Sequence, residues 1–387
     1  MQARMVKLGI VVASINHQPL DQEAEPVLPE PQFYRSLSIA GKPLGIDVYV
    51  FSAGDLQPQG DQLMGYRYEQ NRWVRQFVPL PDVVFDRCFY TQVNQRARCR
   101  GMLEALAKRK PYLPLNGTLP AKLDVYGALK TDSALAKHLP ATFPYRSAEQ
   151  ALRLADQYME GIVLKPSAGM QGRGILFIKR SPSGQEIKVK GRTRQNRAFS
   201  ITFTEDSELE QWICRFIDRS SYLIQPYLAL SGEDGKPFDV RTLMQKDHAG
   251  RWSLSGIVVR TGQAGSLTSN LHGGGDARPA AQLMTAKFGK QKAERLLEQI
   301  HTISKQTVER LESEFGRFAE LGLDYGIEPG GQIWLIEANS KPGRTSFRII
   351  SDHVAARQSI ERPLLYARFL SRRLSPYFAA HEAIHGR

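Results

Sequence analysis

The chain has 387 residues, of which 42% are hydrophobic and 24% charged, values typical of a soluble globular protein with two or three domains. The apolar run 6–15 contains Lys7, is too short to cross a membrane and precedes no small-residue cleavage pattern, so we interpret it as a buried strand and expect no membrane association. Cys88, Cys99 and Cys214 are odd in number and lack CxxC spacing. This argues against a disulfide scaffold or zinc site and favours the cytoplasm.

The net charge of +13 is partly local, because residues 179–197 carry seven bases and one acid. Such a run is either a solvated hairpin or a lid that faces an anion. No nucleic-acid-binding motif accompanies it. Because only the charge points to a nucleic-acid partner, we do not favour such a partner.

Residues 1–115 are predicted to form an α/β domain. Apolar runs alternate with helical periodicity, and the GxGxxG fingerprint of dinucleotide binding is absent. The predicted elements are strands at 7–15, 46–53 and 82–87, a hairpin at 65–78, and helices at 31–40 and 94–110.

Residues 116–230 are predicted to form a second region around a glycine-rich loop. A Ser207–Glu210 capping-box pattern is expected to open a helix with one apolar face. The other predicted elements are a two-piece helix at 121–139 and strands at 161–166, 175–178 and 221–228.

Residues 231–387 are predicted to form a third region that ends in a basic amphipathic helix. Its predicted elements are antiparallel strands at 238–246 and 252–261, a loop at 269–277, helices at 280–318 and 362–374, and a hairpin at 321–339.

Polar residues end the second strand of that hairpin. If Glu328 pairs with Ile333, Asp324 lies opposite Glu337 on one face, and Asn339 points the same way. Two carboxylates this close repel unless a cation lies between them. Their oxygen atoms suit Mg²⁺ or Mn²⁺ and phosphoryl transfer, although a surface hairpin with polar ends fits the same pattern.

The stretch 161–178 places Lys165 at the end of a strand and glycines at 169, 172 and 174 in the loop that follows. Glycines allow tight turns and let backbone amides approach an anion. Together with the acidic hairpin, this loop predicts a nucleotide-phosphate site.

These motifs, in this order, resemble the ATP-grasp superfamily of carboxylate–amine ligases, and within it the YheC/YheD group of endospore coat-associated proteins. The stretches that carry the resemblance, which spans about 116–347, are FDVRTLMQKD, GIVVR, SNLHGGG, ELGLDYGI and WLIEANSKPG. It implies an α/β fold, α+β in the grasp region: an N-terminal α/β domain (1–115), a first grasp part with a glycine-rich lid (116–230) and a C-terminal grasp subdomain with the metal site (231–387).

The resemblance also implies site residues. It implies an ATP site in which Pro226 and Leu228 hold adenine, and Asp324, Glu337 and Asn339 as Mg²⁺ or Mn²⁺ ligands. Arg241, Arg260 and Asn270 are implied at the transferring phosphoryl group, and Lys341 and Arg344 are candidates for the substrate carboxylate. The remaining ATP-binding candidates are Lys122, Lys165, Ser167, Gly169, Gln171, Gly172, Gln225 and Tyr227, with Glu233 or Asp234 for the ribose.

The implied activity is ATP-dependent formation of an amide from an unknown carboxylate and amine through an acyl phosphate. Alternatives are a non-catalytic spore-coat protein that retains the fold and binds coat proteins, and a kinase on the same scaffold. The expected location is the cytoplasm or the spore coat.

Overall fold

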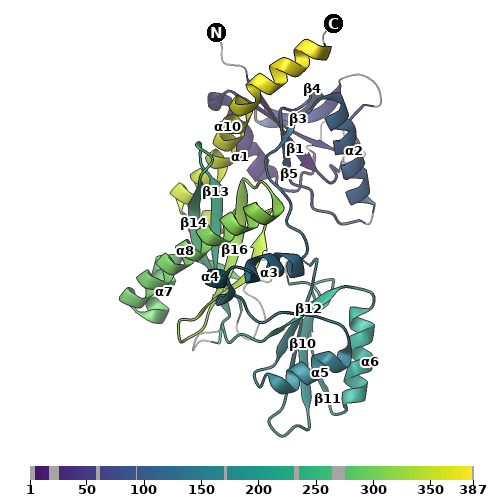
Figure 1. Cartoon of the computed structure of the whole chain (residues 1–387), viewed down its shortest axis with the longest axis vertical. Coiled ribbons are helices and arrows are strands. Elements are labelled where there is room, and N and C mark those ends of the chain that lie inside the picture. The colour runs from purple at the N-terminus through teal and green to yellow at the C-terminus, as the bar shows by residue number, and fades with distance from the viewer. Residues whose placement is uncertain are drawn as a thin grey trace.

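The computed structural model describes residues 5–16, 26–57, 62–92, 94–169, 172–230, 235–263 and 275–385. These residues form three sheets, one for each third of the chain, and Figure 1 shows them as three lobes along the long axis. The mixed α/β class expected from the sequence is confirmed. None of the described helices combines the length and apolar character that a membrane span needs. The domain boundaries stay a prediction.

The N-terminal sheet has the order β4-β3-β2-β1-β5-β6, with β2, β1, β5 and β6 parallel. Helix α2 covers one face, and α1 covers the other together with the C-terminal helix α10 (Figure 1). The elements are β1 (Val6–Val12), α1 (Pro31–Gly41), a 3₁₀ turn (Lys42–Leu44), β2 (Ile46–Ser52), β3 (Leu63–Glu69), β4 (Arg72–Val78), β5 (Val83–Asp86), α2 (Gln95–Arg109) and β6 (Leu113–Pro114).

The middle sheet has the order β11-β10-β9-β8-β12-β7, and its neighbouring strands are antiparallel. Helices α5 and α6 pack on one face through a separate apolar cluster. The elements are β7 (Phe143–Pro144), α5 (Ala148–Gln157), β8 (Ile162–Pro166), β9 (Leu176–Arg180), β10 (Ile187–Arg192), β11 (Ala198–Phe203), α6 (Asp206–Ile217) and β12 (Tyr222–Pro226).

The capping-box prediction is wrong. Helix α6 starts at Asp206, its N-cap is Glu205, and no side chain caps the end. Ser207 therefore lies inside the first turn, where its hydroxyl cannot serve as an N-cap.

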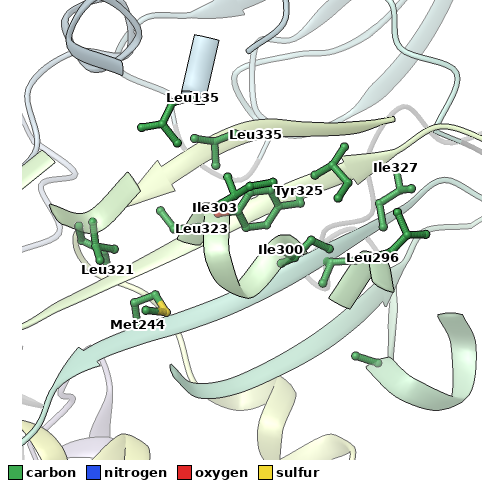
Figure 2. Packing of buried hydrophobic residues seen from close by; sticks show 14 of the residues in the cluster. Leu135, Met244, Leu296, Ile300, Ile303, Leu321, Leu323, Tyr325, Ile327 and Leu335 are labelled. Atoms are coloured by element: carbon green, nitrogen blue, oxygen red, sulfur yellow. The ribbon is translucent and has the colours of Figure 1, made fainter. Parts of the chain in front are cut away.

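The C-terminal sheet has the order β15-β14-β13-β16-β17. Its largest apolar cluster lies between this sheet and α8; Figure 2 shows Ile300 and Ile303 of α8 beside Leu323 and Tyr325 of β16. The elements are α3 (Lys122–Lys130), α4 (Ser133–Ala136), β13 (Phe238–Lys246), β14 (Trp252–Thr261), β15 (Asp276–Pro279), α7 (Ala280–Phe288), α8 (Lys290–Phe315), β16 (Glu320–Ile327), β17 (Ile333–Asn339), α9 (Thr345–Ile349) and α10 (His353–His385).

Helix α10 is much longer than the predicted helix at 362–374 and joins the first and last lobes. Its residues Leu364 and Tyr366 are buried in the core of the N-terminal sheet, whereas Ala355 packs against the C-terminal sheet. The end of the chain therefore fixes the N-terminal sheet beside the C-terminal sheet.

Candidate functional site

A cavity of about 850 Å³ lies where the three sheets meet. Tyr90, in the loop after β5, and Arg96 of α2 line it from the N-terminal lobe, Lys165 from the middle sheet and Glu337 from the C-terminal sheet. A ligand in this cavity would therefore contact all three parts of the chain.

The register of the β16–β17 hairpin decides which side chains reach this cavity. Near the turn Ile327 pairs with Ile333, and Leu335 pairs with Tyr325. A bulge follows, after which Glu337 pairs with Asp324. Because side chains alternate along a strand, Glu337 would otherwise share the buried face of Leu335; the extra residue moves it to the face of Asp324.

The predicted pairing of Asp324 with Glu337 is confirmed, but the strand register from which it was predicted is wrong. Glu328 does not pair with Ile333; its backbone amide donates to the carbonyl oxygen of Gln332 across the turn at 3.0 Å. The bulge compensates for this shift by one residue.

Asp324 is buried and held by two arginines. Arg241 binds it through two guanidinium nitrogens, with Nη2 at 2.6 Å from Oδ2, and Nη2 of Arg260 lies 3.0 Å from Oδ1. Burial alone would raise the pKa of Asp324, but the charges and hydrogen bonds of the two arginines outweigh it and hold the pKa well below its usual range. Asp324 is therefore an anion at neutral pH.

Arg260 also binds Asp239, which lies directly opposite it on β13, at 2.7 and 2.8 Å. It thereby bridges two buried carboxylates. Burial alone would lower the pKa of Arg260, but the charges and hydrogen bonds of the two carboxylates outweigh it and raise the pKa above its usual value. This pairing holds the guanidinium at the cavity wall.

Glu337 and Asn339 complete the oxygen-bearing set. Oε1 of Glu337 lies 3.3 Å from Nζ of Lys122, and the Asn339 amide donates to Asp324 at 3.4 Å. No three His, Cys, Asp or Glu side chains converge in the described part of the chain. Two carboxylates and one amide from adjacent strands nevertheless fit Mg²⁺ or Mn²⁺, which prefer oxygen ligands and retain waters.

The described hydrogen-bond partner of the Lys165 ammonium group is a neutral amide, that of Gln225. The Lys165 Nζ atom donates to Oε1 of Gln225 at 2.8 Å, and Gln225 in turn donates to the hydroxyl of Thr142 at 2.8 Å. Burial and the charge of Lys122 lower the pKa of Lys165, Glu337 acts in the opposite direction, and the net pKa is about 8. A phosphate group beside Lys165 would supply the negative charge that Gln225 lacks.

The glycine-rich loop after β8 forms part of the cavity wall. Ser167, Gly169 and Gly172 line the cavity, and the Ser167 carbonyl accepts from the Lys122 backbone amide at 3.2 Å. Gly172 has a φ of +71°, a conformation that glycine adopts without strain. The predicted Gln171 lies outside the described residues.

The segment predicted to hold adenine is the end of β12, the strand that pairs with β8, which carries Lys165. Pro226, Tyr227 and Leu228 line the cavity near the apolar side chains of Val163 and Ile336. The Tyr227 amide already donates to the Gly161 carbonyl at 2.9 Å. The amide of Leu228 therefore remains the predicted donor to a base in this slot.

The predicted residues otherwise divide as follows. Arg241 does not line the cavity and reaches it only through Asp324, whereas Lys341 lines it and binds Asp86 at 2.9 Å. The Arg344 guanidinium binds buried Glu320 away from the cavity lining, so Arg344 as a substrate ligand is not supported. Asn270, Glu233 and Asp234 lie outside the described residues. The predicted residues that line the cavity are Lys122, Lys165, Ser167, Gly169, Gly172, Gln225, Pro226, Tyr227, Leu228, Arg260, Asp324, Glu337 and Asn339.

Sequence reasoning assigned no role to Thr142, Asp239 or Arg173. Thr142 supports Gln225 from outside the predicted strands, and no local pattern marks it. Asp239 could have been found from the antiparallel pairing of β13 and β14, which puts it opposite Arg260. Arg173 lines the cavity from within the glycine loop.

Two curated proteins of Bacillus subtilis (strain 168) are similar to the chain. The endospore coat-associated protein YheC is 28% identical over 350 residues, which cover 90% of this chain and 91% of YheC. The endospore coat-associated protein YheD is 27% identical over 349 residues, which cover 88% of this chain and 74% of YheD.

Solved structures share the fold at low identity. The D-cycloserine synthetase DcsG superposes with a TM-score of 0.51 at 15% identity, covering 95% of this chain and all of that one. The D-alanine-D-alanine ligase from Coxiella burnetii gives 0.50 at 11% identity, covering 98% and 99%. The sequence profile described as YheC/D like ATP-grasp matches residues 112–370, and the chain therefore belongs to the YheC/D-like ATP-grasp family.

Proposed function

We propose that this protein is an ATP- and Mg²⁺-dependent ligase that joins a carboxylate to an amine through an acyl phosphate. The observation that carries the proposal is the convergence of Lys165, Lys122, Asp324, Glu337 and Asn339 on one cavity. Ligases of the same fold, DcsG and the Coxiella burnetii D-alanine-D-alanine ligase, support the reaction class.

The charge of the site suits a nucleoside triphosphate. Among the residues assigned to the phosphates and the metal, with Asp239, four bases (Lys122, Lys165, Arg241 and Arg260) face three acids (Asp239, Asp324 and Glu337). Arg96, Arg173 and Lys341 also line the cavity, so positive charges outnumber negative ones there. Each base except Lys165 is already bound to an acid in this set. Lys165 is therefore the base most ready to accept a phosphate oxygen.

Asp324, Glu337 and Asn339 would hold the divalent ion. When bound, Mg²⁺ would neutralise phosphate charge and orient the γ-phosphoryl group. Lys122 and Arg260, which pair with these two carboxylates here, would then turn to phosphate oxygens, whereas Arg241 would stay on Asp324.

The chain's own residues position the reactants. In the proposed reaction an oxygen of the substrate carboxylate attacks the γ-phosphorus, and the bond to the β-phosphate oxygen breaks, leaving ADP and an acyl phosphate. An amine then attacks the acyl carbon, phosphate departs, and the nitrogen loses a proton. Arg260 at the cavity wall would stabilise charge on the transferring group, and Arg241 acts as a positioning residue through Asp324.

The adenine would lie in the part of the cavity that is lined by Pro226, Tyr227 and Leu228. The carbonyl of Pro226 would accept from the amino group, and the Leu228 amide would donate to the ring. Val163 and Ile336 supply the apolar surface on which a base can pack.

A non-catalytic coat role is the second candidate, because YheC and YheD are both described as endospore coat-associated. Under either reading we propose the cytoplasm or the spore coat as the location. An assembly role alone gives no reason to keep Asp324 and Glu337 opposed on neighbouring strands.

Thermal unfolding with ATP and MgCl₂ tests the nucleotide site. Nucleotide at ~100 times its Kd would stabilise the wild type by about 2.7 kcal/mol. Glu337→Ala should lose most of this stabilisation, whereas Glu328→Ala, at the turn end of the same hairpin, should retain it. Absence of stabilisation in the wild type would refute the proposal.

Release of ADP and phosphate with paired acids and amines then tests the chemistry. Release that depends on both partners supports a ligase. A stable phosphorylated product would indicate a kinase, and nucleotide binding without turnover of any pair would favour the coat role.

A further inference from the structure

The two faces of the middle sheet differ in chemistry. On one face Ile187 and Val189 of β10 are buried in the cluster formed with α5 and α6. Side chains alternate along a strand, so Lys188, Lys190 and Arg192 project from the opposite face. That face also carries Val163 and Lys165, which line the cavity.

The register makes these bases continuous with the cavity. Lys190 lies opposite Phe177 of β9, which lies opposite Val163 of β8. The Arg192 amide donates to the Ile175 carbonyl at 3.0 Å, next to the glycine loop that contains Arg173. We call Arg173, Lys179, Lys188, Lys190 and Arg192 the basic strip; it begins at the cavity and continues along β10.

The charges of the strip are largely uncompensated. Lys188 lies directly opposite Lys179, and like charges in this position destabilise a sheet. Lys179 binds Glu160 at 3.0 Å, but neither Lys188 nor Lys190 makes an ion pair with any residue that the structure describes.

The other face of the same strands shows the contrast. Arg180, which follows Lys179, binds Asp156 of α5 at 2.6 Å and Asp206 of α6 at 3.0 Å. Arg180 on the helix face thus meets two carboxylates within the chain, whereas Lys188 and Lys190 on the cavity face pair with no carboxylate among the described residues.

We propose that the basic strip binds an acidic polypeptide segment, so that the reacting group reaches the cavity as part of a protein or peptide. The second half of this statement rests on the proposed ligase function. An extended acidic segment repeats same-face carboxylates about every 7 Å, a spacing that lysines along β10 share.

A nucleic acid fits the strip less well. Single strands are bound on aromatic platforms, but Phe199 and Phe203 of β11 turn to the helix face and pack on Trp212 at 5.6 and 5.9 Å. Phe177, on the strip face, is buried against Tyr227 at 4.8 Å. Among the described residues of β9 to β11, no exposed ring is available for stacking.

Fluorescence anisotropy with fluorescein-labelled decaglutamate, without nucleotide and at low salt, tests the proposal. The wild type should bind it more tightly than decaglutamine. The double variant Lys188→Gln/Lys190→Gln should weaken binding roughly ten-fold. The matched control Lys290→Gln/Lys305→Gln removes two exposed lysines of α8 and should bind like the wild type.

The double variant should also unfold at the same or a higher temperature than the wild type, because the repulsion between Lys179 and Lys188 is removed. Equal binding by the double variant and its control would overturn the proposal. Tighter binding of a ten-nucleotide single strand than of decaglutamate at the same ionic strength would overturn it too, in favour of a nucleic-acid surface.

Failure of the acidic-peptide proposal can be distinguished from failure of the proposed ligase function. Lys165→Met should lose ATP binding but retain decaglutamate binding, since Lys165 lies outside the strip. Peptide binding without any ATP-dependent stabilisation would refute only the ligase, and the reverse result would refute only the acidic-peptide site.

Discussion

Nζ of Lys165 lies 2.8 Å from Oε1 of Gln225, so the cation proposed to meet the ATP phosphates is held by a neutral amide rather than a carboxylate. The amide fixes the position of the ammonium group but does not neutralise it. This explains why burial can lower the pKa of Lys165 to about 8.

Nucleotide affinity should therefore fall as the pH rises through 8. Lys165 is protonated below this pH and neutral above it, and bound phosphate would raise its pKa, so binding should take up protons near pH 8. Calorimetry from pH 7 to 9.5 in buffers of different ionisation enthalpy measures both effects. Lys165→Met should bind weakly with no such pH dependence; a wild-type affinity that is flat through pH 9 would contradict this account.

Gln225→Glu should move that pH dependence upward. A carboxylate beside Lys165 favours its charged form and should raise its pKa by about one unit or more. The contact with Thr142 can survive, because the threonine hydroxyl can donate to the new carboxylate. The same titration should give a midpoint above the wild-type value, and an unchanged midpoint would mean that Gln225 does not set the pKa of Lys165.

Arg260→Met should destabilise the fold strongly. It leaves Asp239 without its two hydrogen bonds from Arg260 and removes one of the two arginines on Asp324, at a cost of about 3 to 5 kcal/mol for a broken buried pair. Urea denaturation measures the loss. Arg251→Met, which removes an exposed arginine paired with Asp247, should cost less than about 1 kcal/mol; similar costs for both would show that the buried pairing contributes little.

Arg87 and Glu30 should be strongly coupled. Arg87 is fully buried, donates to both oxygens of Glu30 at 2.7 and 2.8 Å, and lies 3.3 Å from Glu320 of β16. It thus connects the N-terminal sheet to the C-terminal sheet. A double-mutant cycle with Arg87→Met and Glu30→Gln should give a coupling energy of about 1 to 3 kcal/mol. Additive effects would show that the pair does not act as a unit.

The hairpin shows how far local pattern extends. The apolar runs at Leu321 and Ile333 predict two paired strands, and the acid and amide at the end of the second predict a polar cluster. The bulge that turns Glu337 toward Asp324 is not encoded by any local turn signal. With the bulge, Leu335 packs in the apolar cluster beside α8, while Glu337, two residues later, lies opposite Asp324 at the cavity.

The sequence by itself determined the order of the motifs, the family and most of the strands and helices, because apolar periodicity and motif order are local properties of the chain; helix α5 and the full length of α10 were not predicted. Only the tertiary structure decided that Arg241 reaches the cavity through Asp324, that Arg344 is buried against Glu320, and that Gln225 supports Lys165. These contacts join residues far apart in the chain, and the partner of a charged side chain depends on which strands and helices pack together.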